Sequence, residues 1–501
     1  MQKSIKVLAL LLALLCFVTV FVACDGGETN QNDEETTAGK AQESTAEATE
    51  TETEFFPEVE KQNYGAEFYL NIQAGGTNPK KFYWVEEGSK DAMSEAIYAR
   101  QTSVFDHLGV EIIGVEAGAY DSYADKFKTA VKNKDGSVHT LQTHVYFGVV
   151  SMITENYLVD YQKMPGLNLD ADYWNRDFME GLAAGDYLFL GYSDYNLVNT
   201  HVITFNKKLL AQYEDALEES VYDMVQNYHW TLDQMIALAE LVYVDRTADG
   251  KTADDTFGIT GNQWVPFCGM LKACDINFVE LNDQGNYELS VYNEKNKEKC
   301  ADMISKIADL SKSDSSWFWY RTEGTEQVTI TSDRTLMYLQ STFSLTDNLD
   351  YDVDFGVLPF PMYNEDQKEV GYRSLEWGGL LVIPNYLEDA TMVGETLEMM
   401  SFYSDDVTVT FYEKLLGKQV ADAPEDKIML DIIWDSVCSD FGLNYSHMSE
   451  TLDRVIYMVP NLTHANTTES LASYVQSVEK GCDKALSAFF KKLQILKDKM
   501  Q

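Results

Sequence analysis

The chain after residue 60 opens with short strand patterns that alternate with longer helical ones. Residues 67–73 alternate apolar and polar side chains, as a strand does, and residues 91–108 repeat apolar side chains at helical spacing. Residues 110–115 and 120–132 repeat this order. Strand–helix–strand–helix order is typical of a mostly parallel sheet covered by helices. The sequence therefore predicts an α/β fold.

The length of this body limits how it can pack. Residues 61–501 are roughly 440 residues, which exceeds what one hydrophobic core holds, so we expect two lobes. Further strands are predicted at 200–206, 353–357 and 380–383, and further helices at 230–244, 300–310, 393–403 and 470–496. We expect the last helix to be interrupted near Gly481, because glycine has a low helix propensity.

The N-terminus has a secretory pattern. Lys3 and Lys6 precede an apolar run over 7–23, and Cys24 follows directly. Residues 21–24 (FVAC) resemble the bacterial lipobox, although Phe21 replaces the usual aliphatic residue. The resemblance implies that 1–23 is a lipoprotein signal peptide and that Cys24 carries a lipid. The alternative is an uncleaved transmembrane anchor, for which the run is marginally short. Either reading places the body outside the cell, held at the outer face of the bacterial cytoplasmic membrane.

Residues 24–60 form a predicted disordered, acidic linker. Positions 25–60 hold twelve acidic residues and one lysine, and almost no large apolar side chain before Phe55. Such a segment cannot bury enough surface to offset its ordering entropy. The whole chain has a formal net charge of −43. That charge excludes nucleic acid as a partner, because phosphate binding depends on clustered lysine and arginine.

Beyond Cys16 and Cys24 the chain has five cysteines, whose spacing matches no metal site. Two of them, Cys268 and Cys274, are close enough in sequence for either a disulfide or two buried thiols. The sequence leaves both alternatives open.

Five short motifs follow one another in a fixed order along the body: TFNKKLL at 204–210, WTLDQM at 230–235, DTFGI at 255–259, LPFP at 358–361 and GGLLVIP at 378–384. In this order they resemble the signatures of bacterial extracellular solute-binding proteins of family 1, which serve ABC importers. The resemblance covers essentially the whole body.

The resemblance implies a two-lobed fold of the periplasmic-binding-protein type II class, with a ligand cleft between lobes that hinge segments join. It implies lobe 1 at 61–198 and 370–404, and lobe 2 at 199–369 and 405–501. Closure around the ligand is a hinge motion, after which the membrane permease recognises the protein. We therefore expect a monomer that captures a carbohydrate, in particular an oligosaccharide, and that catalyses nothing. No cofactor is expected.

Candidate ligand contacts lie where the resemblance places loops at the carboxyl ends of strands. Sugar-binding members stack aromatic rings on the sugar and bind its hydroxyls with polar side chains. The candidates in matching positions are Trp264, Trp377, Glu376, Arg373, Asp194, Tyr195, His144 and Phe343. Tyr146 stands beside His144 on the same loop. Each of these residues also has an ordinary structural interpretation, because a tryptophan is more often a packing residue than a ligand contact.

Residues 245–251 (DRTADGK) occupy a position at which relatives carry a turn that resembles a calcium loop. Arg246, Thr247 and Ala248 stand where alternating acidic ligands would be needed, so we expect a solvated turn and no metal. The competing functions are a surface glycan-binding adhesin, a glycoside hydrolase, or the same importer role with a non-sugar solute. The sequence holds none of the usual hydrolase, metalloprotease or P-loop motifs.

Overall fold

The computed structural model describes residues 56–500, apart from 76–78, 89, 283–284, 321–325, 347–352, 421–423, 465–466 and 468. The chain divides into two compact units, 1–58 and 59–501, and everything below concerns the second. The predicted signal peptide, Cys24 and residues 24–55 of the linker lie outside the described residues. Within the described part, no helix is both long enough and apolar enough to cross a membrane.

The first sheet has the strand order β13-β3-β1-β2. Strands β1 (Ala66–Gln73), β2 (Val110–Gly118) and β3 (Thr140–Gln142) are parallel, with Leu70 paired to Gly114 on one side and Thr140 on the other. Strand β13 (Leu381–Val382) joins antiparallel to β3. The predicted parallel sheet is confirmed, and its last strand comes from much later in the chain.

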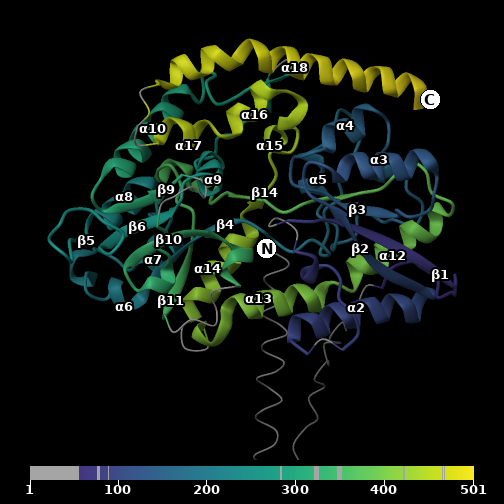
Figure 1. Cartoon of the computed structure of the whole chain (residues 1–501), viewed down its shortest axis with the longest axis horizontal. Helices are drawn as coiled ribbons and strands as arrows, with labels where there is room; N and C mark the ends of the chain where they lie inside the picture. Colours follow the sequence, from purple (N-terminus) through teal and green to yellow (C-terminus); the bar gives the residue numbers. More distant parts are fainter. Residues whose placement is uncertain are drawn as a thin grey trace, which may run out of the picture. The chain divides into compact units, whose positions relative to one another are not determined.

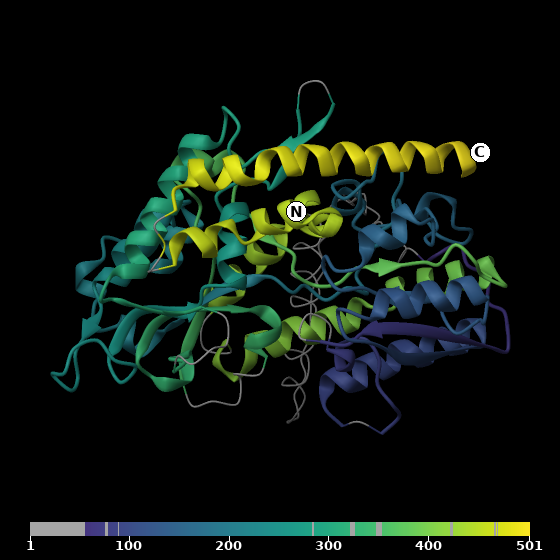
Figure 2. The same cartoon turned by 45° about the horizontal axis from the view of Figure 1, so that its top comes forward.

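Helices cover this sheet on both sides. Helix α2 (Ala92–Leu108) begins where the Asp91 side chain accepts a hydrogen bond from the Ser94 amide at 3.2 Å, and it ends at Gly109 with φ of 63°. Helix α3 (Tyr123–Asn133) lies on the opposite side of the strands from α2 (Figures 1 and 2). Helices α12 (Ala390–Phe402) and α13 (Asp405–Val420) pack against α2.

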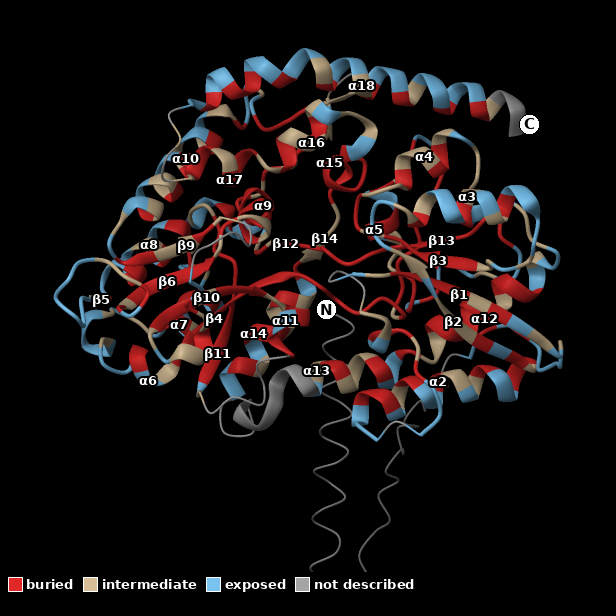
Figure 3. Cartoon of the chain, viewed as in Figure 1, coloured by how far each residue is buried: buried red, intermediate tan, exposed pale blue. Residues whose placement is uncertain are grey.

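The second sheet has the order β11-β4-β10-β6-β5, and β9 also pairs with β6. Its strands are β4 (His201–Asn206), β5 (Tyr243–Val244), β6 (Thr256–Asn262), β9 (Ser316–Trp319), β10 (Thr335–Ser341) and β11 (Phe355–Pro359). Strands β6, β9 and β10 are parallel to one another, whereas β4 is antiparallel to both β10 and β11. The chain thus builds this sheet entirely between β3 and β13, and strands of both sheets are largely buried (Figure 3).

One predicted helix is shorter than expected. Helix α8 (Leu232–Glu240) begins at Thr231, whose side chain accepts from the Gln234 amide, but the helix stops before Val244. Residues 243 and 244 instead form β5 on the edge of the second sheet, antiparallel to β6. An aromatic and a β-branched residue favour this pairing over one more helical turn.

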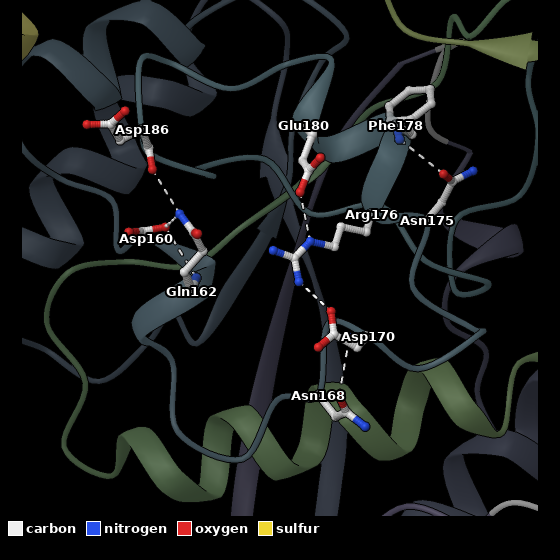
Figure 4. A network of polar contacts seen from close by, with 9 residues as sticks. All are labelled: Asp160, Gln162, Asn168, Asp170, Asn175, Arg176, Phe178, Glu180 and Asp186. Atoms are coloured by element: carbon white, nitrogen blue, oxygen red, sulfur yellow. Dashed lines mark hydrogen bonds and ion pairs between the residues drawn. The ribbon is translucent and has the colours of Figure 1, made fainter.

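The long connection between β3 and β4 has little regular structure beyond α4 (Val149–Thr154) and α5 (Arg176–Glu180). Polar contacts hold it instead (Figure 4). Arg176 is bonded to Asp170 and, at 2.8 Å, to Glu180, while Gln162 donates to the backbone oxygen of Asp186 at 2.9 Å. These contacts give hydrogen-bond partners to polar groups that are not paired within a sheet.

The remaining elements are short strands together with helices of varied length, many of them in the last part of the chain. They are β7 (Val279–Leu281), β8 (Tyr287–Leu289), β12 (Ser374–Leu375), β14 (Val437–Cys438), α6 (Lys207–Leu210), α7 (Val221–Gln226), α9 (Val265–Ala273), α10 (Lys297–Lys312), α11 (Thr342–Leu345), α14 (Pro424–Asp435), α15 (Phe441–Asn444), α16 (Glu450–Ile456), α17 (Met458–Thr463) and α18 (Leu471–Met500), with short 3-10 helices at 80–82, 161–163, 214–216, 330–332, 365–369 and 446–448.

Helix α18 continues through Gly481, so the predicted break there is wrong. A Cβ atom at Gly481 would lie 2.5 Å from Thr451 Cγ2 on α16. The glycine therefore allows α16 and α18 to approach closely and does not interrupt the helix. Helix α18 contacts α4, and α13 contacts α2, so helices assigned to lobe 2 touch helices assigned to lobe 1. The predicted lobe boundaries at 198–199, 369–370 and 404–405 stay a prediction.

Two sequence-level alternatives can be placed in the fold. Cys268 and Cys274 are buried free thiols. In the 245–251 turn, Asp245 uses both carboxylate oxygens to accept from the loop's own amides, including Ala248 and Gly250. No group of three or more potential metal-ligating side chains occurs among the described residues.

Candidate functional site

Aromatic side chains stand just past the carboxyl ends of strands from both sheets. His144 and Tyr146 follow β3 in the first sheet, while Trp264 and Tyr320 follow β6 and β9 in the second. Open α/β sheets bind ligands at this end of their parallel strands. The loops therefore carry the candidate site.

These side chains belong to one connected set of rings, which we call the aromatic cluster. It consists of Tyr120, His144, Tyr146, Phe147, His201, Trp264, Tyr320, Trp377, His447, Tyr457 and His464. The members come from loops of both sheets, from the start of β4, from the segment before β13, and from the region around α16 and α17.

Tyr146 is at the centre of the first half of the aromatic cluster. Its ring centroid lies 4.8 Å from His144, 4.7 Å from Phe147 and 5.3 Å from His447, on which it stacks. Trp377 presents an edge-to-face contact to Tyr146 at 6.0 Å. Aromatic pairs at such separations are favourable by about 0.5–1.5 kcal/mol beyond area burial.

Trp264 is the platform of the second half. Its ring stacks on Tyr457 at 4.1 Å with an interplanar angle of 12°, and Tyr320 meets it edge-on at 5.0 Å. The Tyr320 hydroxyl donates to Asn461 Oδ1 at 2.6 Å. A hydrogen bond between the hydroxyl groups of Tyr146 and Tyr457 joins the two halves. The loop after β3 and the loop after β6 thus meet through Tyr457.

Burial keeps several members of the aromatic cluster uncharged. Burial lowers the pKa of His144 to about 3, with a further contribution from His447, so its imidazole is neutral at physiological pH. Burial also raises the pKa of the Tyr146 and Tyr457 phenols above their usual range. His447 Nε2 lies 3.2 Å from Asp453 Oδ1 at the margin. Flat rings, neutral hydroxyls and one carboxylate suit an uncharged, hydroxyl-bearing ligand.

Of the eight candidate ligand contacts, the structure brings Trp264, Trp377 and His144 into the aromatic cluster. Glu376 is adjacent in sequence to Trp377, but its side chain points elsewhere: it is 3% exposed and accepts from the Tyr192 hydroxyl at 2.8 Å.

The other four candidates lie outside the aromatic cluster. Tyr195 is fully buried beneath the Arg100 guanidinium, and Phe343 packs on Phe82 with 4.8 Å between ring centroids. The Asp194 backbone oxygen accepts from Thr408, and Arg373 Nε lies 3.8 Å from Asp275 Oδ1. A role for these four residues in ligand contact stays a prediction.

The fold and the site can be compared with known proteins. No model of a known protein family and no curated protein matches the chain. Solved structures do. The cyclic alpha-maltosyl-1,6-maltose binding protein from Arthrobacter globiformis matches with a TM-score of 0.55 at 12% identity, covering 84% of this chain and 98% of that one.

Two further structures match over similar lengths. The ABC substrate-binding protein Lmo0181 from Listeria monocytogenes, in complex with cycloalternan, gives a TM-score of 0.51 at 11% identity, with 86% of this chain and 99% of that one covered. UgpB from Mycobacterium tuberculosis, in complex with glycerophosphocholine, gives 0.52 at 14% identity over 86% and 99%.

The chain has the two-lobed α/β fold of ABC-importer solute-binding proteins. The resemblance inferred from the five motifs is confirmed at the level of the fold. The aromatic cluster contains residues that follow parallel strands of both sheets.

The sequence did not reveal several members of the aromatic cluster. Tyr457 and His447 lie in the last part of the chain, in a stretch for which the sequence predicts no element. Only Tyr320 could have been suspected from the sequence, because it directly follows the alternating strand that contains Trp317 and Trp319. None of these positions belongs to a motif, so only the folded chain brings them beside Trp264.

Proposed function

We propose that this chain is the lipid-anchored substrate-binding component of an ABC importer, which captures a carbohydrate by hinge closure and delivers it to the permease. The observation that carries the proposal is the aromatic cluster, because it joins strand-end loops of both sheets through Tyr146, Tyr457 and Trp264. The fold shared with solute-binding proteins supports it.

Carbohydrate is the ligand class that this chemistry favours. A pyranose ring has a flat face of C–H bonds that stacks on an aromatic ring, and hydroxyls that exchange hydrogen bonds with neutral donors and acceptors. Trp264, which is partly exposed, supplies a ring, and the Tyr320 hydroxyl and neutral His144 supply polar partners. Trp377 is 5% exposed and packs against Tyr146 and His201 within the aromatic cluster. Several rings in sequence fit an oligosaccharide better than a single sugar. Two of the structurally similar proteins are described with saccharide ligands, whereas UgpB holds glycerophosphocholine.

The location follows from the N-terminus. Cys24 would hold the protein in the outer leaflet of the cytoplasmic membrane, and the acidic linker would give it reach toward the permease. The protein would act there as a monomer, with the solute and the permease as its partners. Nothing in this role requires catalysis.

A thermal-shift screen of the purified protein against sugars, peptides and polyamines tests the ligand class. We expect an oligosaccharide to raise the melting temperature, and Trp264→Ala to weaken that effect. Trp317→Ala is the matched control, because Trp317 packs in a separate small group with Phe257 and Val328. Stabilisation by a peptide or polyamine alone would contradict the carbohydrate assignment and leave the importer role. Turnover of an oligosaccharide would favour a hydrolase.

Binding without closure would favour the adhesin alternative. Small-angle X-ray scattering with and without the stabilising sugar separates the two functions, because only an importer component needs the lobes to approach each other.

A further inference from the structure

Two segments, 199–200 and 374–378, lie where the chain passes between the two sheets, and a third, 436–438, pairs with the second of them. Thr200 and Glu376 form an antiparallel bridge, and the Trp377 amide donates to the Asn199 carbonyl at 2.7 Å. The Glu376 amide in turn donates to the Cys438 carbonyl at 3.1 Å. Segment 199–200 leads into β4, while 374–378 contains β12 and 436–438 contains β14 (Figure 3). In the two-lobed fold these are the segments where a hinge is expected, and we refer to them below as the hinge strands.

The side chain of Glu376 adds a second set of bonds between these strands. Its Oε1 accepts from the Asn199 amide at 3.1 Å and from the Gly378 amide at 2.6 Å. Its Oε2 accepts from the Tyr192 hydroxyl at 2.8 Å. One carboxyl group therefore connects two hinge strands and the end of the connection that precedes β4.

Glu376 is an unusual residue to find in this position. It is 3% exposed, and within the described part of the chain no lysine, arginine or histidine lies at ion-pair distance from it. Burying an unpaired carboxyl group is costly, and burial raises its pKa to about 7. A carboxyl group retained at such a cost, and bonded to backbone amides of two strands, indicates a positional role.

Gly378 is matched to this arrangement. A Cβ atom on Gly378 would lie 2.7 Å from Glu376 Oε1. A side chain at residue 378 would therefore force the Glu376 carboxyl group to move from its present position. The side chain and the backbone around it are therefore fitted to one geometry.

We propose that Glu376 is the positioning residue of the hinge: its carboxyl group ties strand 199–200 to strand 374–378 and thereby holds Trp377 in place beside Tyr146 and His201. Bending during closure then takes place outside the tied residues, and the Trp377 ring keeps its orientation in the aromatic cluster. The consequence for ligand binding rests on the proposed function, whereas the tie itself does not.

Two substitutions of Glu376 distinguish the effect of its hydrogen bonds from the effect of its charge. In Glu376→Gln the amide oxygen can still accept from Asn199 and Gly378, while the amide NH₂ group can donate to the Tyr192 oxygen. In Glu376→Ala all three bonds are lost, and two buried backbone amides are left without their side-chain acceptor. The conservative variant should therefore preserve the hinge.

The experiment measures the hinge without any ligand. In residues 59–501, which form a compact unit, Lys132→Cys on α3 and Ser305→Cys on α10 are exposed labelling positions near the two different sheets. Spin labels there report the interlobe distance distribution by double electron–electron resonance. Hydrogen exchange of the peptides that contain residues 199 and 378 reports the tie directly.

We expect wild type and Glu376→Gln to share one narrow distance distribution and slow exchange at both amides. Glu376→Ala should broaden the distribution at least twofold and accelerate exchange roughly tenfold. Equal distributions and equal exchange in wild type and Glu376→Ala would overturn the proposal. If Glu376→Ala does not fold, Gly378→Ala takes its place with the same expected and contradicting results. Because no ligand is added, failure of the sugar screen leaves this result intact.

Discussion

Glu376 predicts an unusual pH dependence of stability. Burial raises its pKa from 4.5 to about 7, so the folded protein binds a proton there that the unfolded chain releases. A raised folded-state pKa contributes stability that is fully present below pH 4.5 and is lost as the pH rises through 7. The direction is opposite to that of a carboxylate in a salt bridge.

The magnitude follows from the size of the shift. Each pKa unit corresponds to about 1.36 kcal/mol, and a rise of between two and three units gives on the order of 3 kcal/mol. Glu376→Gln carries no charge at any pH and so avoids this loss. We expect wild type and Glu376→Gln to have similar free energies of unfolding at pH 4.5, and the variant to be more stable by about 3 kcal/mol at pH 8.5.

Urea denaturation at half-unit pH steps from 4.5 to 8.5 measures this difference. Comparing the variant with wild type cancels the titration of every other group. Glu240→Gln, on the exposed end of α8, is the matched control, and its stability should stay within about 0.5 kcal/mol of wild type. A constant difference between wild type and Glu376→Gln across the whole pH range would show that burial does not raise the pKa of Glu376.

Three further substitutions test contacts on which the fold and the aromatic cluster depend, each by urea denaturation. Tyr457→Phe removes one hydroxyl of the Tyr146–Tyr457 hydrogen bond and should cost about 1 kcal/mol, whereas no loss would show that the bond contributes nothing. Gly481→Ala should destabilise by about 1–2 kcal/mol despite the higher helix propensity of alanine, because its Cβ atom meets α16; a gain in stability would contradict the close approach. Lys207→Ala should cost about 3 kcal/mol, since it leaves the buried Asp426 carboxylate without the ammonium group at 2.6 Å. A loss below 1 kcal/mol would show that Asp426 is satisfied by its other donors.

Local patterns predicted much of the fold because they reflect local physics. The 91–108 helix has an aspartate cap and a terminal glycine, both of which act through neighbouring residues, and its predicted extent agrees closely with α2. The 230–244 prediction was too long, because pairing of residues 243–244 with β6 is a tertiary contact that periodicity cannot detect. Gly481 was misjudged for the same reason, since the neighbouring helix and not the helix itself explains it.

The candidate site could be predicted only in part. Trp264, Trp377 and His144 lie on strand-end loops, where the fold class directs attention. The sequence does not indicate where the Glu376 side chain points: in the structure its carboxyl group accepts from the backbone amides of Asn199 and Gly378, and a role in ligand contact stays a prediction. Tyr457 belongs to the aromatic cluster only because helices near the C-terminus return to the strand ends of both sheets.

In the proposed function, a sugar closes the two lobes around the aromatic cluster. The most direct test is the interlobe distance between labels at positions 132 and 305, measured with and without the sugar that gives the largest thermal shift. Saturating sugar should shift the distribution to a shorter distance in wild type, and Trp264→Ala should require at least about tenfold more sugar for the same change. A sugar that binds and leaves the distance unchanged would contradict it.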